Sequence, residues 1–84
     1  MTERKKLERY DLARAALSIM VSHYAELIGD EGKKSTPDAS KIQGWEKVQF
    51  ELSRRQSRLL ANDEDEVERI NSTYGAMAAA VMKR

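Results

Sequence analysis

The fold is decided by residues 10–28, YDLARAALSIMVSHYAELI. Apolar residues recur there in steps of three and four, the spacing of a helix face packed against other helices. This seam consists of Tyr10, Ala13, Leu17, Met20, Tyr24 and Leu27. A second stripe with similar spacing runs beside it and consists of Leu12, Ala16, Ile19 and His23. The two stripes cover more than half of the circumference, so we expect a helix over residues 3–28 that is covered from more than one side.

Two further stretches have helical spacing. Residues 38–61 carry apolar positions at Ile42, Trp45, Val48, Leu52 and Leu59, and residues 63–82 carry them at Val67, Ile70, Tyr74, Met77 and Val81. Between the first two helices we expect a loop, with Gly29 ending one helix and Thr36 capping the next. Asn62 marks the second boundary. So few residues connect the last two helices that they are either separate or fused into one bent helix.

The sequence therefore predicts an all-α protein, a three-helix antiparallel bundle in one domain over residues 1–84. A chain this short buries a small core, and such domains often depend on a metal, a disulfide or another subunit. The chain has no cysteine and only one histidine. By elimination we expect an oligomer, most simply a homodimer.

The net charge and the hydropathy of the chain argue against some classes of function. The net charge of +1 argues against a protein whose main task is to neutralise nucleic-acid phosphates. No apolar run is long enough for a membrane span, and the charged N-terminus does not resemble a signal peptide. We therefore expect a cytoplasmic protein without a membrane partner.

Motifs for catalysis or metal binding are weak. Residues 32–35, GKKS, lack the earlier glycine and the strand of a phosphate-binding loop and predict a turn. The acidic residues 63–66 point about 100° apart on a helix, so they cannot all face one ion. His23 continues an apolar stripe and is best interpreted as a packed or interface histidine. We expect no enzymatic activity, metal or cofactor.

Basic residues form two clusters. The start of the first helix carries Arg4, Lys5, Lys6 and Arg9, and the end of the second carries Arg54, Arg55 and Arg58. In an antiparallel bundle both clusters lie near the acidic residues 63–68. Ion pairing with that acidic run is the favoured interpretation, and a surface for an anionic partner is the other.

The function expected from these features is that of a small non-enzymatic interaction protein. It would be a regulator, inhibitor, antitoxin-like or chaperone-like subunit that binds a partner protein by helix-to-helix contact. The interface candidates are Leu12, Ala16, Ile19, His23, Phe50, Met77 and Val81. The alternative is a nucleic-acid-binding regulator that uses the two basic clusters. The sequence lacks, however, the short glycine-containing turn between two brief helices that is typical of a helix-turn-helix motif.

Overall fold

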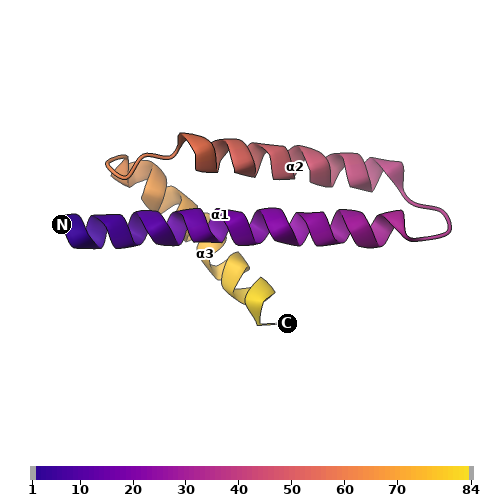
Figure 1. The fold of residues 1–84 in the computed structure, drawn as a ribbon, viewed down its shortest axis with the longest axis horizontal. Coiled ribbons are helices and arrows are strands. Elements are labelled where there is room, and N and C mark those ends of the chain that lie inside the picture. The colour runs from indigo at the N-terminus through magenta and orange to yellow at the C-terminus, as the bar shows by residue number, and fades with distance from the viewer. Residues whose placement is uncertain (1, 84) are drawn as a thin grey trace.

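The protein is all-helical, as the sequence predicted. The computed structural model describes residues 2–83, which form three helices and no strand. The helices are α1 (Glu3–Gly32), α2 (Ala39–Arg58) and α3 (Glu64–Met82). In Figure 1, α2 returns antiparallel alongside α1, and α3 then crosses α1 obliquely.

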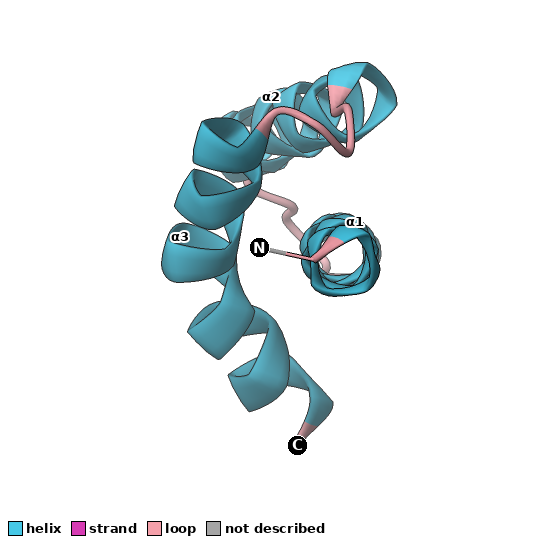
Figure 2. Ribbon diagram, turned by 90° about the vertical axis from the view of Figure 1, so that its left-hand side faces the viewer, coloured by secondary structure: helices cyan, strands magenta, loops and turns pink. Residues whose placement is uncertain are grey.

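Helix α1 is the centre of the bundle, because it packs against both α2 and α3. Figure 2 looks along α1 and shows α2 on one side, while α3 passes another side and carries the C-terminal end away from α2. The molecule is elongated, with extents of 53 × 26 × 14 Å. Part of the α1 surface consequently lies outside both helix contacts.

The core takes one fully buried large side chain from each helix: Leu17, Leu52 and Ile70. Its other buried apolar members are Ala13, Ala16, Met20, Leu59, Val67 and Ala78. The predicted seam of α1 is confirmed, since its central positions belong to this cluster and both of its tyrosines pack against the cluster. Three of the nine buried apolar residues are alanines, so the core is narrow and each large side chain in it matters.

The first helix is longer than predicted. It continues to Gly32, so the prediction that Gly29 ends it is wrong. The reason is Glu31, whose side chain is only 5% exposed. One carboxylate oxygen accepts a hydrogen bond from Lys34 Nζ at 2.9 Å, and the other accepts from the backbone N–H of Asp38 at 2.9 Å. These bonds tie the α1–α2 loop to the end of α1.

The caps of the other helices also differ from the prediction. Asp38, not Thr36, caps α2, because its carboxylate accepts from the backbone N–H groups of Ser40 and Lys41 at 3.0 and 3.2 Å. Asp63, which follows the predicted boundary at Asn62, caps α3. An aspartate at the N-cap satisfies N–H groups that have no partner within the helix.

Helices α2 and α3 are separate, which settles the question that the sequence left open. Helix α2 ends at Arg58, three residues before the predicted end, and Leu59 has extended backbone angles, φ −68° and ψ 131°. Leu59 is nevertheless buried. The apolar stripe of α2 thus continues for one residue beyond the helix, which is why spacing alone placed the helix end too late.

The hydrogen bonds of Glu31 to the loop should make the free energy of unfolding depend on pH in the acidic range. The hydrogen bond from Lys34, followed by that from the Asp38 backbone, lowers the pKa of Glu31 below its ordinary value of 4.5. A carboxyl group whose pKa is lower in the folded state stabilises the fold above its unfolded pKa, and this contribution disappears as pH falls through the folded pKa. Below pH 4.5 the wild type should lose more of its unfolding free energy than Glu31→Gln does.

Urea unfolding followed by circular dichroism at several pH values tests this expectation. At neutral pH, Glu31→Gln should be less stable than the wild type, and the two should converge in acid. Glu46→Gln removes a carboxylate from an exposed position of α2 and is the matched control. Parallel curves for the wild type and Glu31→Gln would contradict the proposed role of Glu31.

Candidate protein-interaction surface

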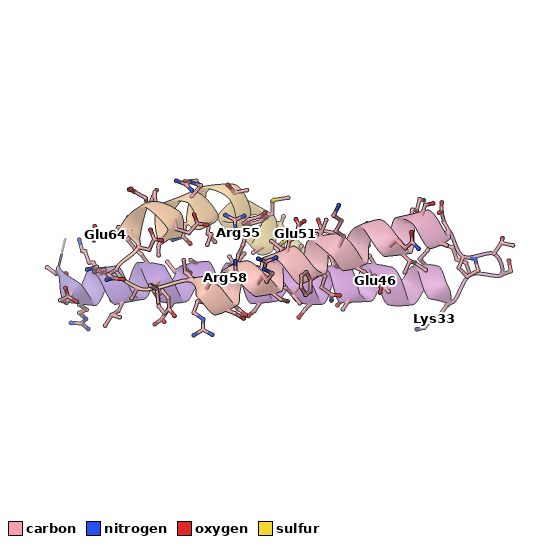
Figure 3. The ribbon with its side chains drawn as sticks, turned by 90° about the horizontal axis from the view of Figure 1, so that it is seen from above. Lys33, Glu46, Glu51, Arg55, Arg58 and Glu64 are labelled. Atoms are coloured by element: carbon pink, nitrogen blue, oxygen red, sulfur yellow. The ribbon has the colours of Figure 1, made fainter. Side chains whose placement is uncertain are left out.

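The start of α1, the end of α2 and the start of α3 lie together. Arg9 of α1 forms an ion pair with Glu68 of α3, and Arg55 of α2 forms one with Glu66 at 2.8 Å between Nη2 and Oε1. Figure 3 shows Arg55 where α2 faces α3. The acidic run of α3 therefore pairs with one residue from each basic cluster.

Arg55 is the link between α2 and α3. Besides Glu66, its guanidinium donates from Nη1 to the Tyr74 hydroxyl at 3.3 Å. The guanidinium carbon lies 5.6 Å from the centroid of the Tyr74 ring. The hydrogen bond from Arg55 also lowers the pKa of Glu66. The branched guanidinium of Arg55 thus makes a charged hydrogen bond and a cation–π contact at the same time.

Replacing Arg55 with lysine should loosen α3 from α2. An ammonium group cannot reproduce the two-sided contact with Glu66 and Tyr74. Because about a third of the Arg55 side chain is exposed, we expect a loss of only about 1 kcal/mol of unfolding free energy. Urea unfolding measures this loss, and hydrogen exchange should show faster opening of the α3 amides. Arg54→Lys changes the neighbouring exposed residue, and an equal loss there would refute the linking role.

The other residues of the two basic clusters are exposed, except for Lys6, whose side chain is 23% exposed. Arg4 pairs with Glu8 and Lys6 pairs with Glu3, both at 3.8 Å within the first turns of α1. Lys5 is exposed. Arg54 and Arg58 line an open hollow on α2 together with Arg55 and Glu51. Figure 3 labels Arg58, Arg55 and Glu51 along this helix.

An apolar groove runs between α1 and α3 and has a volume of about 500 Å³. Helix α1 contributes Arg9, Leu12, Ala15, Ala16 and Ile19, and α3 contributes Asn71, Gly75, Ala78, Ala79 and Met82. Asn71 donates to the backbone carbonyl of Arg9 at 3.1 Å and closes one end. Leu12 is 63% exposed beside the groove, an unusual position for a leucine in the middle of a packed helix.

The groove brings together three of the predicted interface residues: Leu12, Ala16 and Ile19. On α3 the sequence predicted Met77 and Val81 as interface residues, whereas the groove wall consists of Gly75, Ala78, Ala79 and Met82. The available signal was the run of alanines after Gly75, whose small side chains leave space beside a helix. Spacing within α3 could not show which face would border α1.

The remaining predicted interface residues lie elsewhere. Phe50 is exposed on α2 and lines a different hollow. Met77 is two residues from Ala79, about 200° around α3, so it faces away from the groove. Val81 packs against the core, and His23 is half-buried on α1. The predicted residues therefore do not form a single surface.

Comparisons of the chain with known protein families, with curated proteins and with solved structures found no match. Within residues 2–83, no three carboxylate or histidine side chains gather as metal ligands. None of the helices described is both long enough and apolar enough to cross a membrane. The α1–α3 groove gathers three of the predicted interface residues and is the candidate binding surface.

Proposed function

We propose that this chain is a non-enzymatic helical interaction protein that binds a helix of a partner protein along the α1–α3 groove. The observation that carries the proposal is the groove itself, with Leu12 exposed and Ile19 half-buried beside small residues of α3. A helix of the partner protein, bound in this groove, would cover the apolar face of α1 that α2 and α3 leave open. Recognition of an amphipathic helix by an apolar groove is a common mode of protein–protein binding.

Charge pairing favours a protein partner over nucleic acid. Arg9 and Arg55, one from each basic cluster, are engaged by carboxylates of α3. Binding to a phosphate backbone depends on cations that are free to neutralise it. A regulator, inhibitor, antitoxin-like or chaperone-like subunit would use the groove in the same way, by helix-to-helix contact.

Site-specific photo-cross-linking in the native host tests the proposal. A photoreactive residue at position 12 or 19 should form covalent adducts with another polypeptide, either a copy of this chain or a different protein. The same residue at position 57, exposed on α2, is the control for random collision. Equal adduct yields at the groove and at position 57 would refute the function, whatever the adducts contain.

A further inference from the structure

The exposed face of α1 carries a stripe with an ordered sequence of charges. Along the helix it contains Lys5, Glu8, Leu12, Ala15, Ile19, His23 and Glu26, again in steps of three and four. Three and four residues correspond to about one helical turn, so these side chains lie one above the other. Its apolar centre, Leu12 to Ile19, belongs to the groove, and its two ends carry polar groups.

This stripe complements itself when two copies run in opposite directions. With Ala15 of one copy beside Ala16 of the other, Leu12 faces Ile19 of the second copy. In the same register Glu8 faces His23, and Lys5 faces Glu26. A parallel pairing would instead set Lys5 against Lys5 and Glu26 against Glu26, which costs free energy through like-charge repulsion. The arrangement of charges therefore selects the antiparallel direction.

Glu8 and His23 also have contacts within their own chain. The ion pair of Glu8 with Arg4 spans 3.8 Å between exposed side chains, and exposed pairs of this kind contribute little. His23 packs edge-on against the Tyr24 ring, with 5.7 Å between ring centroids.

The shape of the α3 wall fits the same arrangement. Outside the turns of its own helix, no heavy atom within residues 2–83 lies within 4 Å of the Cβ position at Gly75. Glycine is a poor residue for the middle of a helix. Gly44 of α2 is equally open, and Gly75 differs from it in that it lines the groove. Small residues at Gly75 and Ala79 would let a second helix approach α1 and α3 closely.

We propose that the helix in the α1–α3 groove is α1 of a second copy of this chain, in a two-fold antiparallel pairing with Leu12 opposite Ile19 of the second copy. This inference rests on the proposed function and names its partner. A two-fold contact uses the same patch on both copies, so the assembly closes as a dimer. The dimer would bury Leu12 of both copies, a residue that is 63% exposed in a single copy.

Cysteine cross-linking tests the register directly, because the wild-type chain has no cysteine. In the antiparallel dimer, Ala15→Cys places the two thiols next to the symmetry axis, within the reach of a disulfide. Leu12→Cys alone and Ile19→Cys alone would place equivalent residues about 10 Å apart along the axis, and only their mixture should cross-link efficiently. Ala25→Cys, exposed on α1, is the matched control, since its copies would lie about 28 Å apart.

Sedimentation of the full chain at micromolar to submillimolar concentrations supplies the second readout. The wild type should form dimers, and Leu12→Glu should raise the dimer dissociation constant about 100-fold, because it places a charge in an apolar contact. Phe50→Glu introduces the same charge at an exposed aromatic outside the groove and should leave dimerisation unchanged. Circular dichroism of both variants tests whether the helices are retained. If Leu12→Glu does not fold, the pattern of cysteine cross-links alone tests the antiparallel dimer.

Three results would overturn the inference. They are a wild type that stays monomeric throughout, cross-links from Leu12→Cys alone that equal those of the mixture, or a dimer that persists in folded Leu12→Glu. If the wild type is monomeric but positions 12 and 19 still form adducts with another protein in the host, the second copy is ruled out and the proposed function stands. If neither dimer nor adduct is found, both fail.

Discussion

Leu17→Ala should lower the free energy of unfolding by about 3 kcal/mol. Leu17 is fully buried on α1, between the two helices that pack against it. Truncation removes buried methyl groups and leaves a cavity, which typically costs about 2–5 kcal/mol. For a chain of this length the total stability is on the order of 4–13 kcal/mol, so this single change should remove a large share of it.

Leu7→Ala is the matched control, because it removes the same atoms from a half-exposed position of the same helix. It should cost below about 1 kcal/mol. Urea unfolding at low protein concentration, followed by circular dichroism, measures both variants without a contribution from association. Similar losses for the two leucines would mean that Leu17 is not at the centre of the core.

Leu59→Ala should be nearly as damaging, with an expected loss of about 2–4 kcal/mol. Leu59 lies just after α2, outside regular helix, yet it is 5% exposed and belongs to the core. Its backbone carbonyl also accepts a hydrogen bond from the Tyr10 hydroxyl at 3.4 Å, which ties the α2–α3 connection to α1. A smaller side chain would leave a cavity where all three helices converge.

The neighbouring Leu60 provides a close control. Leu60 is 63% exposed in the same connection, so Leu60→Ala should change the unfolding free energy by less than about 1 kcal/mol. The two variants differ by one position in the chain and have identical composition. If Leu60→Ala proves as costly as Leu59→Ala, the connection packs differently from the structure described here.

The local sequence pattern was sufficient to predict the three helices and the buried face of α1. Spacing by three and four placed Ala13, Leu17 and Met20 on one side of a helix, and all three are in the core. This worked because helical periodicity is a property of the backbone and does not depend on which partner covers the face. The predicted ends of the first two helices were less accurate. Gly29 and Thr36 are residue types that often end or cap a helix, but the carboxylates of Glu31 and Asp38 make the hydrogen bonds at these ends.

Spacing in α1 showed from the sequence alone that this helix carries two apolar stripes and needs more than one neighbour. The direction from which those neighbours come is a tertiary property. The oblique crossing of α3 buries Ala16, leaves Leu12 exposed, and places Gly75 and Ala79 rather than Met77 beside the groove. A periodic pattern states which residues share a face of one helix. The angle at which two helices cross depends on how their side chains interlock, and that angle decided which predicted interface residues lie together.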